Sequence, residues 1–379
     1  MKILFVATVR SHVGQFHMPF IKCLIEAGHE VHAAFRDNSK DKKGLDLSGI
    51  SQVHEIPFER NPLKINNIKA YYAMKKLLKE GNYDIVHCHT PVGGVITRLA
   101  SLEARKNGMK VFYTAHGFHF YKGASKKYWL LYYPIEKYLS RFTDCLILIN
   151  QEDYDIAIKK SFCANKIVKV SGVGVDLEKF AYDLRYQKAE LRRKHGFQDD
   201  DFILIYPADL SKRKNQMMLL RVISRLKHTI PQIKLLLPGQ PVLLEKYHQY
   251  AIENNIASRV EFMGYRRDIY ELLALSDVAV SSSRQEGLPI NIIEAMSVGK
   301  PVVATNVRGN ADLIDDEKGG YLVELNDDKR MAEKIITIFQ SKSLQEEMGR
   351  YNVVHVNEFS VNNVNKELKE IYEWAGCSF

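Results

Sequence analysis

Residues 277–309, DVAVSSSRQEGLPINIIEAMSVGKPVVATNVRG, constrain the fold most, because they predict a strand, a loop, a helix, a turn and a second strand in succession. The apolar run 277–281 has the length of a buried strand. Pro289 is expected at the first helical position, and Gly299 ends the helix before a strand at 302–305. This succession is typical of open α/β sheets, which bind ligands at the carboxyl ends of their strands.

Two carboxylates lie in this segment, Glu286 in the loop and Glu294 inside the helix. Acidic residues are common near helix starts, so Glu286 taken alone fits a solvated acid. Glu294 lies in an apolar helix and needs hydrogen-bond partners, which ribose hydroxyls would supply. The backbone N–H groups of Gly287 and Leu288 would face a diphosphate at the helix start. Glu286 would then reach the hydroxyls of a sugar beyond the diphosphate.

Alternating strands and helices extend over the whole chain and predict an α/β protein with parallel sheets covered on both faces. The first half contains predicted strands at 2–8, 30–35, 53–56, 85–89, 110–115 and 145–149, and helices at 18–26, 69–80, 94–106 and 128–141. The second half contains predicted strands at 202–207, 233–238, 260–264, 277–282 and 301–306, and helices at 188–195, 215–227, 242–254, 269–275, 289–298 and 329–339.

The segment SGVGVDLEKF at 171–180 interrupts the pattern with two glycines and indicates a linker. We therefore predict an N-terminal Rossmann-like domain at 1–172, a linker at 173–182 and a C-terminal Rossmann-like domain at 183–360. The tail 361–379 contains an amphipathic helix with Leu368 and Tyr372 on its apolar face, which we expect to pack back on the N-terminal domain.

The composition indicates a globular protein with anionic partners. The 379 residues carry a net charge of +9, which suits phosphorylated ligands, nucleic acid or an acidic membrane surface. The five cysteines form no CxxC pair, and the start MKILFVATVR is too short for a signal peptide, so we expect a reducing, cytoplasmic location. GxGxxG and P-loop motifs are absent, which argues against a dinucleotide cofactor and an NTPase.

Two turns carry further candidate residues. The turn ADLSKRKNQ at 208–216 is predicted between a strand and a helix, where Arg213 and Lys214 could neutralise a diphosphate leaving group, while Lys212 fits a solvated position. After the first strand, a polar loop is predicted to contain Gly14. That glycine either lets the loop approach a ligand or simply forms a tight turn.

Histidines follow two of the predicted strands. His116 in TAHGFHFYKG is followed by Gly117, with His119 and Lys122 nearby, a cluster that favours a site. His87 and His89 form an HxH pair, but no acidic ligand lies near them in the sequence, so we expect no metal site.

The segment 118–141, FHFYKGASKKYWLLYYPIEKYLSR, mixes aromatic residues with lysines. It is either a helix with a buried aromatic face and a solvated basic face, or an interfacial segment that contacts anionic lipid head groups. The density of Tyr and Trp favours the membrane. Nucleic acid would suit the charge equally well, but no nucleic-acid-binding motif is present.

Together these motifs identify a family. EGLPINIIE, from Glu286 to Glu294, resembles the E-x7-E element of retaining glycosyltransferases of family 4, which have the GT-B fold. The resemblance covers almost the whole chain, through SHVGQ, HCHTP, YTAHGFHFYKG, SGVGVD, KNQ, VEFMGYRRDI and GKPVVATNVRGNADLI. It is closest to the bacterial branch that builds capsule and exopolysaccharide repeat units.

The resemblance implies two facing Rossmann-like domains, with a nucleotide-sugar held in a deep interdomain cleft mainly by the C-terminal domain. It implies transfer of a hexose or N-acetylhexosamine, expected from a UDP-sugar, to a saccharide linked to undecaprenyl diphosphate, with retention of anomeric configuration. Carried onto this sequence, Glu294 would bind ribose, Glu286 the donor sugar and Lys214 the diphosphate. Gly14 would let the first loop approach the donor, and His116 would contact the donor sugar or position the acceptor.

The resemblance also implies a metal-independent enzyme without a cofactor, peripherally associated with the inner face of the cell membrane. One position departs from the family pattern. Asp209 stands where many members have an arginine, five residues before Lys214, so Arg213 or Lys212 is expected to supply the missing charge. The alternatives are a nucleotide-sugar epimerase of the same architecture and a non-enzymatic two-lobed protein that binds anions or nucleic acid.

Overall fold

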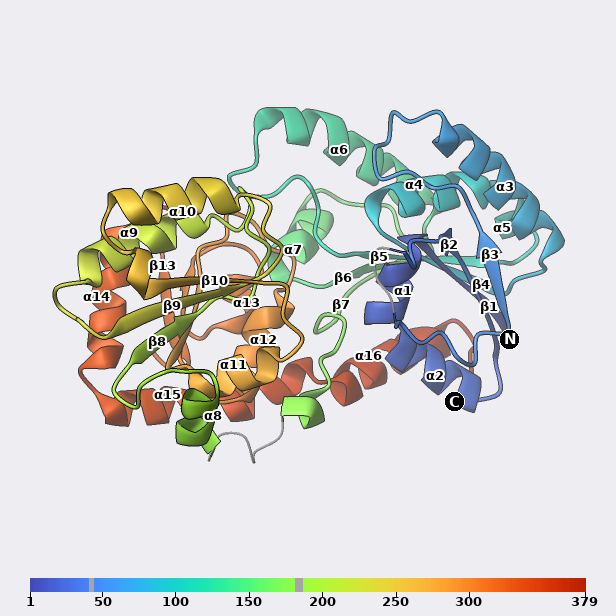
Figure 1. The fold of residues 1–379 in the computed structure, drawn as a ribbon. Helices are drawn as coiled ribbons and strands as arrows, with labels where there is room; N and C mark the ends of the chain where they lie inside the picture. Colours follow the sequence, from blue (N-terminus) through green and yellow to red (C-terminus); the bar gives the residue numbers. More distant parts are fainter. Residues whose placement is uncertain (41–43, 181–186) are drawn as a thin grey trace. The chain divides into compact units, whose positions relative to one another are not determined.

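A computed structural model describes residues 1–40, 44–180 and 187–379 (Figure 1). The chain divides into two compact units, unit 1 made of Met1–Gly174 and Val361–Phe379 and unit 2 of Val175–Ser360. The chain leaves unit 1 after Gly174 and returns to it after Ser360. The predicted linker 173–182 contains the first of these points, whereas its last two residues and the predicted domain start at 183 lie outside the described residues.

Unit 1 is a doubly wound α/β domain. Within its described residues, seven parallel strands form one sheet in the order β3-β2-β1-β4-β5-β6-β7. The order reverses between β1 and β4, the place where sheets of this kind bind ligands. The strands are β1 (Lys2–Val9), β2 (Glu30–Arg36), β3 (Gln52–Glu55), β4 (Ile85–His89), β5 (Lys110–Ala115), β6 (Cys145–Leu148) and β7 (Lys166–Lys169).

Helices cover both faces of this sheet, with α3, α4 and α6 on one face and α2 and α16 on the other (Figure 1). Side chains alternate between the two faces, so Val86 and Cys88 of β4 join the core under α3 and α4, while His87 and His89 face the other way. The helices are α1 (Arg10–Phe16), α2 (Met18–Glu26), α3 (Asn66–Glu80), α4 (Pro91–Ala100), α5 (Leu102–Lys106), α6 (Lys126–Leu139), α7 (Gln151–Lys159) and α16 (Val361–Trp374).

The C-terminal helix α16 belongs to unit 1 although nearly 190 residues of unit 2 precede it in the chain. It packs beside α2, and its buried face carries Val364, Ile371 and Tyr372. The hydroxyl of Tyr372 lies 2.8 Å from Nδ1 of His87 on β4. The carboxylate of Glu367 accepts hydrogen bonds from the backbone N–H and the hydroxyl of Ser171. The last segment of the chain thus completes the core of the first domain.

Unit 2 repeats the architecture with a different sequence. Its described residues form a six-stranded parallel sheet in the order β10-β9-β8-β11-β12-β13, which reverses between β8 and β11. The strands are β8 (Phe202–Ile205), β9 (Ile233–Pro238), β10 (Val260–Gly264), β11 (Val278–Ser281), β12 (Val302–Thr305) and β13 (Gly320–Val323). The helices are α8 (Lys188–Lys194), α9 (Gln216–Leu226), α10 (Leu244–Glu253), α11 (Ile269–Leu275), α12 (Ile290–Ser297), α13 (Asn310–Leu313), α14 (Asp328–Phe339) and α15 (Lys342–His355).

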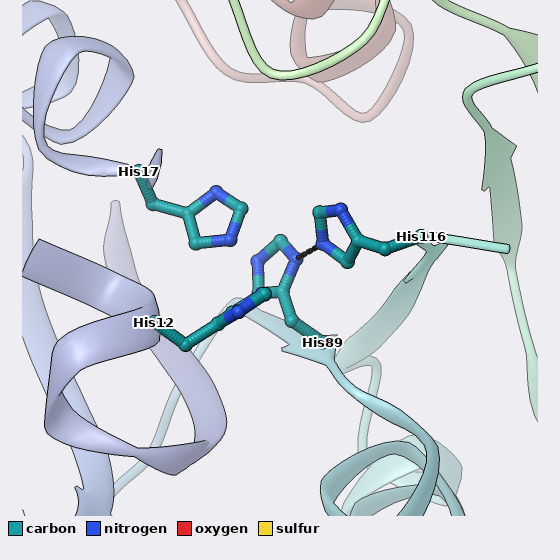
Figure 2. A group of neighbouring side chains, drawn as sticks. All are labelled: His12, His17, His89 and His116. Atoms are coloured by element: carbon teal, nitrogen blue, oxygen red, sulfur yellow. Dashed lines mark hydrogen bonds between the residues drawn. The ribbon is translucent and has the colours of Figure 1, made fainter. Parts of the chain in front are cut away.

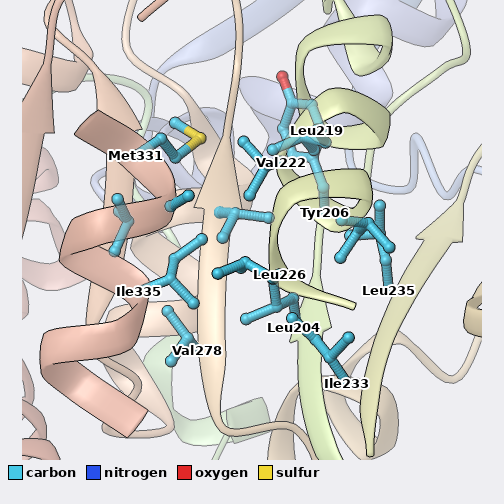
Figure 3. Packing of buried hydrophobic residues seen from close by; sticks show 14 of the residues in the cluster. Leu204, Tyr206, Leu219, Val222, Leu226, Ile233, Leu235, Val278, Met331 and Ile335 are labelled. Carbon is cyan, nitrogen blue, oxygen red and sulfur yellow. The ribbon is translucent and has the colours of Figure 1, made fainter. Parts of the chain in front are cut away.

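Both faces of the second sheet are buried. Phe202 and Leu204 of β8 point into a core shared with α9 and α14, which Figure 3 shows at Leu219, Val222, Met331 and Ile335. The intervening residues Ile203 and Ile205 belong to the core on the other face, under α11 and α12. Each fully buried side chain of this size contributes about 1.5–3 kcal/mol to folding. A strand that is buried on both faces of a sheet is therefore expected to have apolar residues at successive positions, as in FILI.

Most predicted strands and helices are present within a few residues of their expected bounds. The edge strands β7 and β13 and the helices α1, α7, α13 and α15 had no counterpart in the prediction. The residues of β7 are half-buried or exposed, so KIVK lacks a continuous apolar pattern. Of the helices that the structure describes, none combines the length and the apolarity needed to cross a bilayer.

Candidate active site

Two loops of unit 2 meet at the carboxyl edge of its sheet, where the strand order reverses. One leads from β8 to α9 and contains the basic turn, and the other leads from β11 to α12 and contains Glu286. Arg284 donates its backbone N–H to the carbonyl of Arg213, 2.9 Å away, so the loops are bound to each other through their main chains. Neighbouring parallel strands bring these loops together although they lie about 70 residues apart in the sequence.

Glu286 is the centre of this cluster. Its carboxylate lies 2.5 Å from Nζ of Lys214 and 3.0 Å from Nη1 of Arg213. Its side chain is only 6% exposed and that of Lys214 is 12% exposed, so this ion pair is largely screened from water. Burial by itself would raise the pKa of Glu286, but the charges of Lys214 and Arg213 outweigh it and the pKa lies below the usual value. Glu286 is therefore a buried, charged carboxylate and not a solvated acid.

A second set of side chains orients Glu286. The hydroxyl of Ser283 donates to its carboxylate, and the hydroxyl of Tyr206 lies 2.6 Å from that of Ser283. The buried Arg308 donates from Nε to the backbone carbonyl of Glu286 at 2.9 Å. None of these three residues was predicted from the sequence. Ser283 lies three residues before Glu286, but Tyr206 and Arg308 come from other strand ends, for which the chain gives no local signal.

Glu294 has a different environment. It lies in the second turn of α12 among buried apolar neighbours, and it has no hydrogen-bond or ion-pair partner in the described part of the chain. Burial raises the pKa of its carboxyl to about 7. No described contact joins Glu294 to Glu286, so the glutamate of the loop and the glutamate inside α12 occupy separate positions. Their predicted roles remain predictions.

The start of α12 is open to a ligand. Pro289 is the N-cap residue and not the first helical residue as predicted, and no described side chain caps this helix start. Gly309 has φ +81°, and a Cβ there would lie 2.4 Å from the carbonyl oxygen of Gly287. Within the described residues, no hydrogen bond engages the N–H of Gly287 or Leu288. Free N–H groups at a helix start favour an anion.

The three basic residues of the turn are not equivalent. Lys214 is largely buried against Glu286, Arg213 is half exposed and reaches both Glu286 and the carbonyl of Gln285, and Lys212 is exposed. Asp209 is exposed as well and accepts a hydrogen bond from the backbone N–H of Gln240. Arg213 therefore supplies a second cation beside Lys214, whereas no hydrogen bond or ion pair within the described residues joins Lys212 to the cluster.

In unit 1, His116 lies just beyond the end of β5 and contacts other histidines (Figure 2). Its Nε2 lies 3.4 Å from Nδ1 of His89, the last residue of β4. His12 of α1 and His17, between α1 and α2, complete a group of four rings. Burial lowers the pKa of all four, that of His116 to about 4, and neighbouring imidazoles lower the pKa of His12, His17 and His89 further. The rings are therefore neutral imidazoles at neutral pH.

The prediction for the loop after β1 was wrong. Residues 10–16 form helix α1, so Gly14 lies on a helix and not in a loop. A Cβ at Gly14 would lie 3.0 Å from Cβ of Leu45. In unit 1 the glycine therefore allows close packing of α1 against the segment around Leu45. Its predicted approach to a donor remains a prediction.

The two histidines of the HxH pair have different partners in the structure. His87 lies 2.8 Å from the hydroxyl of Tyr372 and 2.7 Å from that of Thr114, so both of its ring nitrogens have partners. Burial lowers the pKa of His87 to about 3. His89, two residues later, instead joins the four-histidine group.

The segment 118–141 divides into a buried and an exposed part. Phe118 and Phe120 are buried in the unit 1 core, so the first aromatics of the segment are structural. On α6, Leu130 is 82% exposed, and Leu131 and Tyr138 are more than half exposed. The segment before α3 and its first turns expose further apolar side chains, at Leu63, Ile65, Ile68 and Tyr72. This second set was not predicted from the sequence. Helix α3 lies on the same side of the sheet as α6 (Figure 1).

Comparison with known families accounts for both units. Residues 2–150 match a family model described as glycosyl transferase 4-like, and residues 187–353 match glycosyl transferases group 1. EpsD of Bacillus subtilis (strain 168), which is named a glycosyltransferase, is 41% identical over 98% of this chain and 96% of its own length. The chain is a group 1 glycosyltransferase.

Other relatives of this glycosyltransferase carry more specific names. The UDP-Gal:alpha-D-GlcNAc-diphosphoundecaprenol alpha-1,3-galactosyltransferase of Escherichia coli is 32% identical over 83% of the chain and 81% of its own length. The crystal structure of Anabaena Alr3699/HepE in complex with UDP and glucose matches with a TM-score of 0.79 at 21% identity, over 98% of this chain and 99% of that one. The two Rossmann-like domains are those of the GT-B fold. These matches support a transferase and not the epimerase or the non-enzymatic binding protein that were considered as alternatives.

Proposed function

We propose that this glycosyltransferase moves a hexose or N-acetylhexosamine from a UDP-sugar to a saccharide linked to undecaprenyl diphosphate, with retention of anomeric configuration, during capsule or exopolysaccharide synthesis. The observation that carries the proposal is the cluster before α12, where a buried carboxylate, two cations and an uncapped helix start come together. The name of the Escherichia coli relative and the UDP bound by the Anabaena protein support the choice of donor and acceptor.

Each residue of the cluster has a role in donor binding. Glu294 would accept hydrogen bonds from two ribose hydroxyls, which would give its unpartnered carboxylate the donors it lacks. The N–H groups of Gly287 and Leu288 would hold the diphosphate at the start of α12. Lys214 and Arg213 would balance its charge. Glu286, oriented by Ser283, would accept hydrogen bonds from the hydroxyls of the sugar.

The chemistry requires no protein nucleophile in this proposal. The acceptor hydroxyl attacks C1 of the sugar from the face that the diphosphate leaves. The bond from C1 to the diphosphate oxygen breaks, the bond from C1 to the acceptor oxygen forms, and the acceptor proton passes to an oxygen of the departing diphosphate. Lys214, Arg213 and the α12 N-terminus would stabilise the charge that develops on the leaving group. His116 of unit 1 would contact the donor sugar or position the acceptor, with Gly14 near the donor, and no metal would take part at the diphosphate.

We also propose a peripheral contact with the anionic inner face of the cell membrane, where the lipid-linked acceptor resides. The exposed Leu130, Leu131 and Tyr138 of α6 would enter the head-group layer, and Lys126 and Lys127 at the start of α6 would contact phosphates. An amphipathic helix of this kind binds reversibly, which suits an enzyme that must take up a nucleotide-sugar from the cytoplasm.

Product analysis tests the proposed transfer. Purified protein would be screened by thermal shift against UDP- and GDP-sugars, and the stabilising donors would be incubated with an undecaprenyl-diphosphate-linked saccharide from membrane lipid extract. We expect a UDP-sugar to raise Tm and yield a lipid-linked product with the anomeric configuration of the donor, read by NMR. Stabilisation by GDP-sugars alone would contradict the donor assignment. An inverted product would contradict the mechanism.

A further inference from the structure

Four imidazoles gather at the carboxyl edge of the unit 1 sheet, outside the donor cluster of unit 2. Each of His12, His17, His89 and His116 offers a ring nitrogen, and these four nitrogens all lie within 4.8 Å of one another (Figure 2). The rings of His17 and His89 are stacked with centroids 3.7 Å apart, and those of His12 and His116 meet edge to face at 4.8 Å. Packing alone would not require the nitrogen atoms of four neutral rings to point toward one another.

Three nitrogens of the group are buried without a hydrogen bond. Nε2 of His12, of His17 and of His89 has no hydrogen-bond partner within the described chain. An unsatisfied buried polar atom costs about 1–3 kcal/mol, so three in one group indicate a missing partner. His87 gives the contrast, because both of its nitrogens are bonded on the same face of the same strand.

We propose that His12, His17, His89 and His116 bind a divalent transition-metal ion, with Zn²⁺ as the preferred ion. Neutral imidazole is a ligand for Zn²⁺, Cu²⁺ and Ni²⁺. The described group contains no carboxylate, so it lacks the oxygen ligands that Mg²⁺ and Ca²⁺ prefer. This inference stands on the geometry of unit 1 and does not rest on the proposed transfer reaction.

The observed spacing can contract to a metal site. At a Zn–N distance of about 2.1 Å, the nitrogens of a tetrahedral site lie about 3.4 Å apart. Nε2 of His116 and Nδ1 of His89 already lie 3.4 Å apart, and side-chain rotation would bring the unpartnered Nε2 atoms of His12, His17 and His89 to the same spacing. Four protein ligands would close the coordination sphere, which is typical of structural zinc sites.

The backbone beside the group is held in a rare conformation. Thr90, directly after His89, has φ 66° and ψ 149°, a region that is almost confined to glycine. Its hydroxyl lies 2.7 Å from that of Thr8 and accepts the backbone N–H of Thr8 at 3.1 Å, which fixes the end of β4 to the end of β1. The strain is consistent with a position that must direct His89 toward the group.

This inference revises the expectation of no metal site. That expectation treats His87 and His89 as an isolated pair and rests on the lack of an acidic residue near them in the sequence. In the structure the partners of His89 come from three other segments, and His87 takes no part. If His116 binds the ion through Nε2, its Nδ1 stays available to a substrate hydroxyl, so the metal site and the proposed role of His116 are compatible.

Metal content tests the site directly. The chelator-treated full-length protein would be dialysed against Zn²⁺ and analysed by plasma emission spectroscopy, and Co²⁺ would be added to read tetrahedral coordination from its visible absorption. We expect a single equivalent of Zn²⁺ and a rise in Tm. His12→Ala and His17→Ala should each weaken binding by at least about tenfold, because each removes a direct ligand. His12 is only partly buried, whereas His17 is buried, so the His12 variant keeps the test valid if His17→Ala fails to fold.

Two controls separate this site from other binding. His228→Ala removes an exposed imidazole elsewhere and should leave zinc binding unchanged. His195, Asp268 and Glu271 form the other described group that could hold an ion. Zinc that is lost in His195→Ala and kept in folded His12→Ala would overturn the proposal. A wild-type protein that takes up no more zinc than folded His12→Ala would also overturn it.

Discussion

Glu286 and Lys214 form a buried ion pair, with 2.5 Å between Oε1 and Nζ. Removal of one partner from such a pair leaves an uncompensated charge, so the pair stabilises the loop before α12. Under the proposed function, a diphosphate at the start of α12 would compete with Glu286 for this lysine, and the sugar hydroxyls would bind the released carboxylate.

Substitution of Lys214 tests its role at the diphosphate. Lys214→Met should lower turnover by about 100-fold or more, because it removes a cation from the site where charge develops. Lys212→Met is the matched control, since it removes an exposed lysine two residues earlier. It should leave turnover within about twofold. Initial rates with donor and acceptor measure both, with circular dichroism as the check on folding. A folded Lys214→Met enzyme with near-normal rates would remove this lysine from the mechanism.

Substitution of Glu294 tests its unpartnered, buried state. Burial raises the pKa of the Glu294 carboxyl from 4.5 to about 7. Between these two pH values, the folded protein keeps a proton on Glu294 that the unfolded chain has lost. The contribution of Glu294 to stability therefore falls as the pH rises through this window. Glu294→Gln should be more stable than wild type at pH 8 by about 3 kcal/mol, with the difference vanishing near pH 4.

Urea unfolding at several pH values measures this difference for Glu294. Added UDP should reverse the order at pH 8, because ribose hydroxyls favour the carboxylate over the amide. Equal stability of wild type and Glu294→Gln across the pH range would show that the carboxyl is solvated or paired in solution.

At the scale of the elements, α6 and the segment before α3 expose more apolar surface than the fold of unit 1 requires. Leu130 and Leu131 of α6 are both largely exposed, and so are Leu63 and Ile65 before α3. Helix α4 contacts both α3 and α6. Clusters of exposed apolar side chains mark an interaction surface.

The double substitution Leu130→Ser and Leu131→Ser should reduce binding to anionic vesicles. Two leucines that enter the head-group layer contribute several kcal/mol, so we expect at least about a tenfold loss of the bound fraction in co-sedimentation. The matched control is Ile158→Ser with Ile252→Ser, two exposed isoleucines on α7 and α10 that are 48% and 49% exposed. Equal vesicle binding by both double variants would contradict the assignment of α6 as the membrane surface.

At the scale of the whole molecule, the chain returns to unit 1 for its last 19 residues and closes that unit with α16. Tyr372 is fully buried there, packs against Phe20 and Phe112, and meets His87 through its hydroxyl. The stability of unit 1 therefore depends on residues that the chain reaches only after unit 2. Each unit nevertheless has its own core.

Substitution of Tyr372 should destabilise one unit selectively. Tyr372→Ala should cost about 3–5 kcal/mol through the cavity it leaves. Tyr372→Phe should cost about 1 kcal/mol through the lost hydrogen bond. Scanning calorimetry should show one transition moving to lower temperature while a second, which UDP raises, stays in place. A uniform shift of the whole unfolding profile would contradict independent cores.

Long apolar runs made the architecture predictable. A run such as FILI or IVHCH at the centre of a parallel sheet is buried on both faces, so its pattern does not depend on which helix covers it. Helix α1 was missed for the opposite reason. RSHVGQF combines Arg10, a glycine and three polar residues, and only its packing against the sheet and the segment around Leu45 makes it helical. Tertiary contacts override weak local propensity in such segments.

The site shows the same division at closer range. The motif from Glu286 to Glu294 has a fixed spacing on one loop and one helix, so the chain alone predicted a carboxylate at a helix start and another inside the helix. The burial of Glu286, its pairing with Lys214 and its support by Tyr206 and Arg308 depend on strands that become neighbours only in the folded sheet. The four histidines of unit 1 are likewise spread over more than 100 residues. Local spacing specifies which groups an element presents, and the strand order alone specifies which of them meet.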